Sequence, residues 1–206
     1  AKTVEEEGLP STLLKTHDDR NIGIYSVTTD AWGERTFHYW RNQSAARLLF
    51  KDVESLPVTR IIFLSGISVA ILSDPARRNL VSQLEALKDS TLIAYDSQYR
   101  PRLWQSKSEA QTVTEKMWEL TDIALPSIDD EMALFDDTSE DMVLDRFAKQ
   151  HWKACAIKRG ERGPWSPTLQ QQPEFAPACH VVDTTAAGDS FNAGYLSAFV
   201  RGKTEY

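Results

Sequence analysis

The stretch DTTAAGDSFNAGY (residues 183–195) joins a turn of small residues to the start of an apolar helix. Small side chains over residues 184–188 let backbone N–H groups approach an anion, and a helix N-terminus adds positive partial charge. Asp189 falls in the first turn of this helix, where a carboxylate also suits an ordinary helix start. The alternative is a phosphoryl-transfer site, in which the amides bind the phosphoryl group and the acid accepts a proton.

Upstream of this stretch, apolar strand patterns alternate with helical ones. We expect strands near residues 58–66, 91–98, 122–126 and 154–160, and helices that begin near residues 74, 106, 128, 139 and 188. Asp74 before Pro75 is typical of a helix cap, and Ser106 with Glu109 forms a capping box. This order predicts an α/β fold with a mainly parallel sheet, whose ligands bind beyond the carboxyl ends of the strands.

A separate hairpin signal precedes this region. Residues 21–30 and 35–41 are rich in β-branched and aromatic residues, and a Gly-containing turn at 31–34 separates them. Alternation places Phe37, Tyr39 and Arg41 on one face of the second strand. We expect a small β lid at about 21–41 within an N-terminal part of residues 1–57, followed by an α/β core of residues 58–206.

Composition limits the classes of function. The chain has 206 residues and a net charge of −7, which disfavours binding to nucleic acid or to an anionic membrane. The longest apolar run, at residues 61–64, is too short to span a bilayer. Cys155 and Cys179 show no metal-binding spacing, as expected of free thiols in a reducing compartment. We therefore expect a cytoplasmic protein.

The stretch at 183–195 resembles the C-terminal signature of the pfkB/ribokinase family of carbohydrate kinases, D-T-x-G-A-G-D-x-F. Ala186 stands where many members have Gly. The resemblance implies a ribokinase-like three-layer α/β/α fold and ATP-dependent phosphoryl transfer to a sugar hydroxyl. It also implies that Asp189 is the catalytic base, and that the amides of Ala186, Ala187 and Gly188 hold the transferring phosphoryl group.

Other segments resemble the branch of this family that acts on the sugar acid 2-keto-3-deoxygluconate. They are GERTFHYWRN (33–42), LSGISVAILS (64–73), DSQYRPRLW (96–104), TDIALPSIDDE (121–131) and IKRG (157–160). This resemblance runs from about residue 22 to residue 203. It implies phosphorylation of the terminal hydroxyl of that acid, with another sugar such as fructose as the alternative substrate.

A sugar acid presents a carboxylate and several hydroxyl groups, which Arg and Tyr side chains suit. The resemblance implies that Tyr25, Tyr39, Arg41 and Arg100 contact the sugar acid. The alternative for the tyrosines is cross-strand packing. For the two arginines it is a solvated surface charge.

The segment around Lys158, Gly160 and Gly163 resembles the K-x-G-x-x-G segment that the family places against ATP. Asp183, the first residue of the signature, is assigned to the same nucleotide site. Spacing alone would also fit an ordinary strand exit followed by a turn.

The segment at residues 127–131 occupies the place of the family's N-x-x-E motif, with Ser127 instead of Asn. The resemblance implies that Ser127 lies on the nucleotide side, and that Asp130 or Glu131 helps to organise Mg²⁺ and phosphate. Exposed acids at a helix start are the alternative. Mg²⁺ is expected in either case, because the phosphates of ATP need neutralising.

The chain begins without Met and stops soon after its last helical pattern, and the Gly-Gly segment that usually opens the family is not evident. We therefore expect a shortened kinase with weak or no activity, and a non-catalytic remnant that only binds a ligand is the second hypothesis. The expected partners are the sugar acid and ATP. The resemblance also implies a possible homodimer through the lid.

Overall fold

The computed structural model describes residues 2–29, 35–51, 55–176, 178–181 and 183–203. Its elements are α1 (Lys2–Glu6), β1 (Ile24–Thr29), β2 (Arg35–Trp40), the 3-10 turn η1 (Ala45–Leu48), β3 (Ile61–Ser65), α2 (Gly66–Ala70), α3 (Asp74–Leu87), β4 (Leu92–Asp96), η2 (Pro101–Leu103), α4 (Lys107–Leu120), β5 (Ile123–Ala124), α5 (Ile128–Phe135), α6 (Glu140–Ala148), β6 (Ala154–Cys155), η3 (Gly160–Arg162) and α7 (Ala187–Val200). Among these described helices, none is long and apolar enough to cross a membrane.

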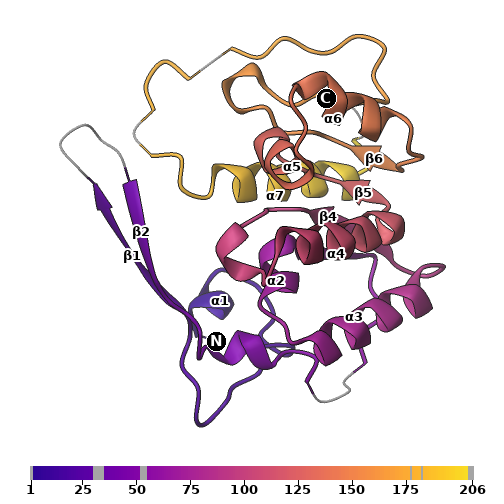
Figure 1. Ribbon diagram of the computed structural model, residues 1–206. Coiled ribbons are helices and arrows are strands. Elements are labelled where there is room, and N and C mark those ends of the chain that lie inside the picture. The colour runs from indigo at the N-terminus through magenta and orange to yellow at the C-terminus, as the bar shows by residue number, and fades with distance from the viewer. Residues whose placement is uncertain (1, 30–34, 52–54, 177, 182, 204–206) are drawn as a thin grey trace.

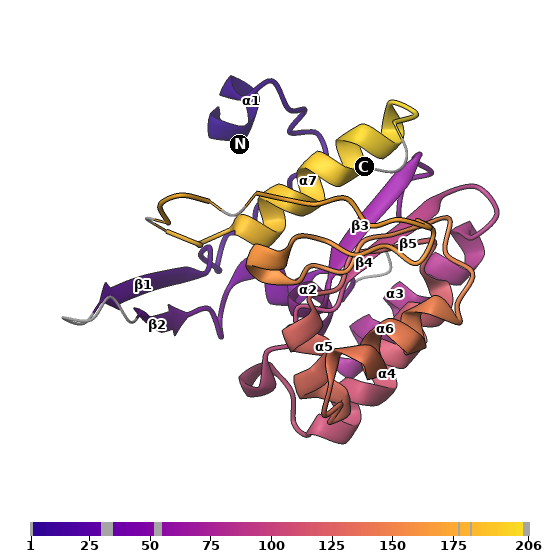
Figure 2. The same cartoon turned by 90° about the horizontal axis from the view of Figure 1, so that it is seen from above.

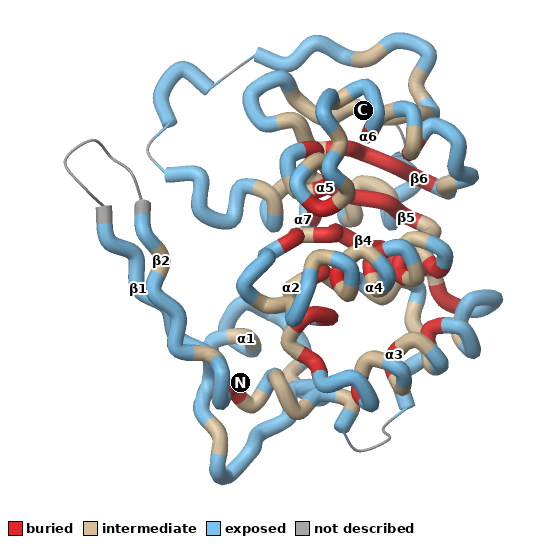
Figure 3. The backbone as a smooth tube through the Cα atoms, in the orientation of Figure 1, coloured by how far each residue is buried: buried red, intermediate tan, exposed pale blue. Residues whose placement is uncertain are grey.

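The predicted parallel sheet is confirmed. Its four strands lie in the order β3-β4-β5-β6, and all neighbours are parallel. Helices α3, α4 and α6 cover one face, and α7 covers the other (Figures 1 and 2). The arrangement is the three-layer α/β/α architecture that the family resemblance implied. The buried residues concentrate in the sheet and the helix surfaces that face it (Figure 3).

The two faces of the sheet differ in side-chain size. On the α3 and α4 side, Ile93 and Tyr95 are fully buried in a cluster of large apolar residues. On the α7 side, three small residues, Ala94, Ala154 and Ala156, pack against the aromatic residues of that helix. Small side chains beneath α7 allow its rings to lie close to the strands.

Alternation along the strands also decides where the polar strand ends point. Asp96 lies two residues beyond Ala94, and Lys158 lies two residues beyond Ala156. Residues two apart on a strand share a face. Both charged side chains therefore face α7 at the carboxyl edge of the sheet.

Two predicted helix starts have different outcomes. The capping box at Ser106 is confirmed, because its hydroxyl accepts a hydrogen bond from the amide of Glu109 at 3.0 Å. The cap predicted at Asp74 is wrong, because Ser73 has the extended backbone of the N-cap and Asp74 is the first helical residue. Asp74 instead pairs with Arg77 one turn later, at 2.6 Å.

The predicted hairpin is present, with Tyr25 opposite Tyr39 and Val27 opposite Phe37. Its predicted turn, residues 31–34, lies outside the described residues. The hairpin projects from the body of the molecule, on the side where α7 begins (Figures 1 and 2), and most of its side chains are exposed. The division of the chain at residue 58 stays a prediction.

Candidate active site

A tight turn leads into α7. The carboxylate of Asp183 accepts a hydrogen bond from the amide of Thr185 at 2.8 Å. Ala186 then adopts φ 59°, a left-handed conformation more often occupied by Gly, and becomes the N-cap of the helix. The amide of Ala187 donates to the carbonyl of Thr184 at 3.1 Å. One of the three amides predicted to hold a phosphoryl group is therefore already bonded within the turn.

Asp189 lies in the first turn of α7 and is exposed. Its Oδ1 accepts a hydrogen bond from Nε2 of Gln98 at 2.8 Å. The neighbouring Gly188 lies above Lys158, since a Cβ atom at Gly188 would be 3.9 Å from Cε of that lysine. An acid, a helix N-terminus and a buried cation thus meet at the carboxyl edge of the sheet.

Lys158 points into the protein, and its side chain is 11% exposed. Its ammonium donates to Oδ2 of Asp96 at 2.6 Å, to Oδ1 of Asn192 at 2.9 Å and to the carbonyl of Leu125. Burial lowers the pKa of Lys158, and the Asp96 carboxylate opposes that shift. Because the ammonium has three protein acceptors, the predicted contact with ATP would require one of these bonds to break.

The two predicted nucleotide glycines lie in the turn after β6, at either end of η3. Gly160 has φ 62° and Gly163 has φ 73°, a region that favours Gly. A Cβ atom at Gly163 would lie 2.2 Å from the ring of Phe175. Backbone conformation and the Phe175 ring together favour Gly at position 163, whether or not a nucleotide binds there.

Glu131 is fully buried in α5 and does not reach the surface. Its Oε2 accepts from Nη1 of Arg146 at 2.6 Å, and Arg146 also pairs with Asp137 at 2.5 Å. Burial raises the pKa of Glu131, and Arg146 opposes that shift. Oε1 of Glu131 and Oγ of Ser97 are both buried without a hydrogen bond of standard geometry, although the Ser97 hydroxyl lies close enough to lower this pKa.

Asp130 is the predicted metal residue that lies nearer to solvent, with its side chain 20% exposed. It pairs with Arg100, a predicted sugar residue, at 2.9 Å. Desolvation raises the pKa of Asp130, and Arg100 opposes that shift. Across the described residues, no group of three or more His, Cys, Asp or Glu side chains is arranged to hold a metal ion. Mg²⁺ commonly uses one or two carboxylates together with nucleotide phosphates, so Asp130 fits that role and Glu131 does not.

Ser127 lies at the start of α5 and forms a parallel bridge with Lys158, which places it beside the end of β6. Its hydroxyl makes no capping hydrogen bond to the helix. The backbone of Lys158 accepts from the amide of Ile128 at 2.9 Å. The two predicted nucleotide segments, 127–131 and 158–163, are therefore neighbours in space.

Three of the predicted sugar residues gather on the hairpin. The rings of Tyr25 and Tyr39 lie 6.1 Å apart between centroids, and the guanidinium of Arg41 lies 4.2 Å from the centroid of Tyr39. The fourth, Arg100, lies in the segment between β4 and η2, where it pairs with Asp130. The structure thus places the predicted sugar residues on two separate elements.

Sequence reasoning assigned no role to Asp96, Asn192 or Arg146. Asp96 and Asn192 are buried, and their hydrogen bonds join segments far apart in the chain. Two signals were available: Asp96 shares its strand face with Ala94, and Asn192 follows Asp189 by three residues on one helix.

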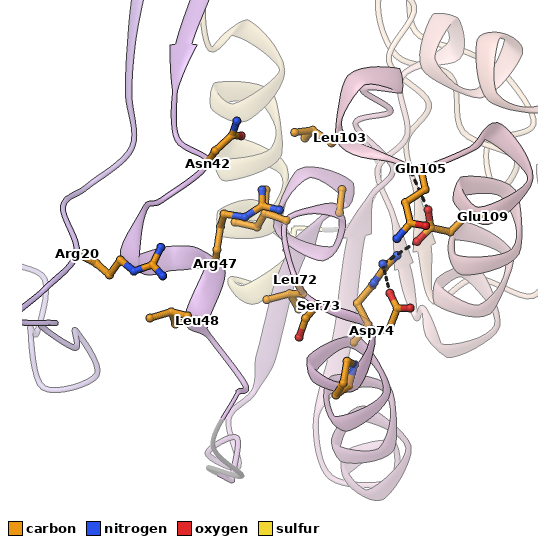
Figure 4. Close-up of a pocket in the computed structure, with 14 residues that line it drawn as sticks. Arg20, Asn42, Arg47, Leu48, Leu72, Ser73, Asp74, Leu103, Gln105 and Glu109 are labelled. Carbon is orange, nitrogen blue, oxygen red and sulfur yellow. Dashed lines mark hydrogen bonds and ion pairs between the residues drawn. The ribbon is translucent and has the colours of Figure 1, made fainter.

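A cavity of about 550 Å³ is lined by the segments that flank the hairpin, by α2 and α3, and by the segment from η2 to α4 (Figure 4). Its lining includes Arg20, Arg47, Leu72 and Arg77, and Arg77 is paired with Asp74 and Glu109. Among the described residues, none predicted to bind sugar, nucleotide or metal lines this cavity.

A parallel α/β sheet with an acid and a small-residue turn at the start of a covering helix is an arrangement that suits a phosphotransferase. Residues 1–204 match the pfkB family of carbohydrate kinases. The chain belongs to that family.

Individual relatives support the assignment. The chain is 40% identical to a 2-dehydro-3-deoxygluconokinase of Haemophilus influenzae, over 97% of this chain and 67% of the relative. It is 34% identical to a probable fructokinase-4 of Arabidopsis thaliana, over 97% of this chain and 63% of that protein. The chain therefore spans about two thirds of the length of these relatives.

The fold also matches a solved structure. Aminoimidazole riboside kinase of Salmonella enterica, complexed with aminoimidazole riboside and an ATP analog, superposes with a TM-score of 0.78 at 20% identity. The match covers 100% of this chain and 67% of the other. This likeness shows the ribokinase-like fold.

Proposed function

We propose that the protein transfers the γ-phosphoryl group of ATP to the terminal hydroxyl of 2-keto-3-deoxygluconate. The products are 2-keto-3-deoxy-6-phosphogluconate and ADP. The observation that carries this proposal is the 40% identity to a 2-dehydro-3-deoxygluconokinase along nearly the whole chain. The lower identity, 34%, to a probable fructokinase makes fructose the second candidate acceptor.

In the proposed reaction, Asp189 accepts the proton of the sugar hydroxyl. The sugar oxygen forms a bond to the γ-phosphorus while the bond from that phosphorus to the bridging oxygen of ADP breaks. The N-terminus of α7, with the amides of Ala186, Ala187 and Gly188, stabilises the developing negative charge. Exposure of Asp189 at this helix end supports the role, and the Ala187 amide would leave its Thr184 partner to take part.

The nucleotide is proposed to lie along the neighbouring segments that carry Ser127, Lys158, Gly160 and Gly163, with Asp183 at the turn. Asp130 would hold Mg²⁺, which when bound neutralises the charge on the phosphates. Glu131, being buried, orders α5 through Arg146 instead of meeting the ion directly. These roles are supported by the adjacency of the segments at one edge of the sheet.

The sugar acid is proposed to lie between the hairpin and this edge. Arg41 and Arg100 offer charge to its carboxylate, and Tyr25 and Tyr39 offer hydroxyls and apolar ring faces. Large apolar side chains are exposed on the hairpin, with Ile24 at 57% and Trp40 at 64%. Their exposure supports a homodimer in which the hairpins of two subunits pair. We also propose that the protein is cytoplasmic.

The test is an ADP-release assay on the full-length gene product with 2-keto-3-deoxygluconate, fructose and ribose as acceptors. We expect the highest kcat/KM with the sugar acid. Turnover with fructose or ribose but not with the sugar acid would move the assignment within the family. Ligand binding without turnover of any acceptor would favour the non-catalytic alternative.

A further inference from the structure

The turn formed by Asp96, Ser97 and Gln98, here called the 96–98 turn, follows β4 and is hydrogen-bonded to α7. Two of its side chains reach that helix: Asp96 accepts from Nδ2 of Asn192 at 2.7 Å, and Gln98 donates to Asp189 at 2.8 Å. Asn192 and Asp189 lie three residues apart and therefore on the same face of α7. The 96–98 turn thus contacts the N-terminal part of that helix at two points.

Asp96 is the centre of this arrangement and is fully buried. Its Oδ2 receives hydrogen bonds from Lys158 at 2.6 Å and from Asn192 at 2.7 Å, and Lys158 also donates to Asn192 at 2.9 Å. The three side chains form a closed triangle that joins β4, the end of β6 and α7. Charged and polar groups that satisfy one another away from water hold their elements in one arrangement.

The backbone of the turn is constrained as well. Gln98 has φ 31°, a left-handed conformation, and its amide donates to Oδ1 of Asp96 at 3.3 Å. On the other side, the carbonyl of Ser97 lies 1.8 Å from the place that a Cβ atom at Gly66 would occupy. A turn held on both sides in a sparsely populated conformation is typical of functional sites.

We infer that Asp96 and Gln98 are positioning residues for the base, with Asp96 fixing the turn and the start of α7, and Gln98 fixing the carboxylate of Asp189. The inference rests on the proposed role of Asp189. With Oδ1 bonded to Gln98, the second carboxylate oxygen is the one presented to the hydroxyl of the acceptor. Misplacement of a reacting group by about 1 Å can cost roughly 10²-fold in rate.

A purely structural role predicts something different. If the triangle only stabilises the fold, its loss lowers stability and leaves kcat of the folded fraction unchanged. A matched control exists at the opposite edge of the same sheet. Asp122 pairs with Lys153 at 3.0 Å and accepts from the amide of Ile93 at 3.0 Å, with its side chain only 13% exposed.

The test compares Gln98→Met, Asp96→Asn and the control Asp122→Asn in the full-length gene product. Gln98→Met keeps the length of the side chain and removes the donor. We expect its kcat to fall about 10- to 100-fold, with KM for ATP and for the sugar acid unchanged and the melting temperature unchanged. Asp122→Asn should lower the melting temperature and leave kcat unchanged.

Asp96→Asn should lower kcat, and should also speed amide hydrogen exchange over residues 187–192 more than Asp122→Asn does. Hydrogen exchange needs no turnover, so it tests the link from Asp96 to α7 even in a protein that phosphorylates none of the acceptors. Absence of turnover in the wild type would count against the proposed function alone. The inference is overturned if Gln98→Met keeps kcat within twofold of an active wild type, or if exchange in α7 is the same in both aspartate variants.

Discussion

The carboxyl edge of the parallel sheet and the β1–β2 hairpin are built in opposite ways. At the sheet edge, Asp96 is fully buried and bonded to Lys158 and Asn192. On the hairpin, Tyr25 and Tyr39 are 52% and 45% exposed. Their rings contact each other and Phe37, and Tyr39 also contacts Arg41. A two-stranded hairpin alone is marginally stable in water.

The difference separates two tasks. Groups that handle a proton and a phosphoryl group gain from fixed positions in a site of low dielectric constant. Groups that recognise an acceptor can lie on an element that moves when the acceptor enters. The sheet edge should therefore control kcat, and the hairpin should control KM.

The largest expected effect comes from Asp189, the proposed base. Asp189→Asn removes the proton acceptor while keeping the shape and the bond to Gln98, so kcat should fall roughly 10²- to 10⁴-fold. Because Asp189 is exposed, stability should hardly change. Steady-state kinetics and thermal unfolding measure both. A variant that kept most of the wild-type rate would show that Asp189 is not the base.

The next effect concerns stability at the sheet edge. Lys158→Met leaves the buried Asp96 carboxylate without its cation, which should lower the free energy of unfolding by about 3–5 kcal/mol. The control Lys153→Met removes a lysine that is 57% exposed and should cost less than about 1 kcal/mol. Urea unfolding compares the two, and equal losses would mean that the triangle adds nothing beyond a surface pair.

A smaller effect is expected on the hairpin. Arg41→Leu should raise KM for the sugar acid about 10- to 100-fold through loss of a charge-assisted hydrogen bond, with kcat nearly unchanged. His38→Ala, on the opposite face of β2, is the control and should change neither. If Arg41→Leu instead lowered kcat at unchanged KM, the proposed division of tasks would be wrong.

The smallest effect is a pH dependence at Glu131. Burial raises its folded-state pKa above the ordinary 4.5, so folding favours its protonated form. Its contribution to stability is full below pH 4.5 and is lost as pH rises through the folded pKa. Glu131→Gln should remove this loss of stability with rising pH. Denaturant midpoints of the wild type and the variant, measured from pH 4.5 up to neutral pH, test this.

The partly exposed Glu140 gives a control of opposite sign. Arg162 lowers its pKa, so Glu140→Gln should remove a contribution that is lost as pH falls. If the wild type and Glu131→Gln showed the same dependence of stability on pH, the prediction for Glu131 would be contradicted.

The fold was predictable because its signals are local. Strand alternation, helical periodicity and the pairing of Ser106 with Glu109 depend on neighbours a few residues away. The start of α3 was misplaced by one residue because Ser73 and Asp74 are both good caps, and only the backbone conformation distinguishes them.

The site was predictable only where a motif carried it. The signature located Asp189, but the triangle joins residues 34 to 96 positions apart. Such pairs depend on which strands become neighbours and how α7 lies across them. The pairing of Arg146 with Glu131 is similar, because it depends on the packing of α5 against α6. Strand-face alternation, applied one step beyond Ala94 and Ala156, would have indicated that Asp96 and Lys158 share a face.

The three alanines beneath α7 set how far that helix lies above the strands. α7 begins at the carboxyl edge, so Ala156, the residue before Lys158 on this face, lies toward the N-terminal part of the helix, and Ala154 lies toward the helix farther along. A larger apolar side chain at Ala154 or at Ala156 would shift one part of α7 away from the strands. The distance from Asp189 to a bound acceptor would then change. Apolar substitutions at these positions therefore offer a graded series in acceptor distance that leaves every polar residue of the site intact.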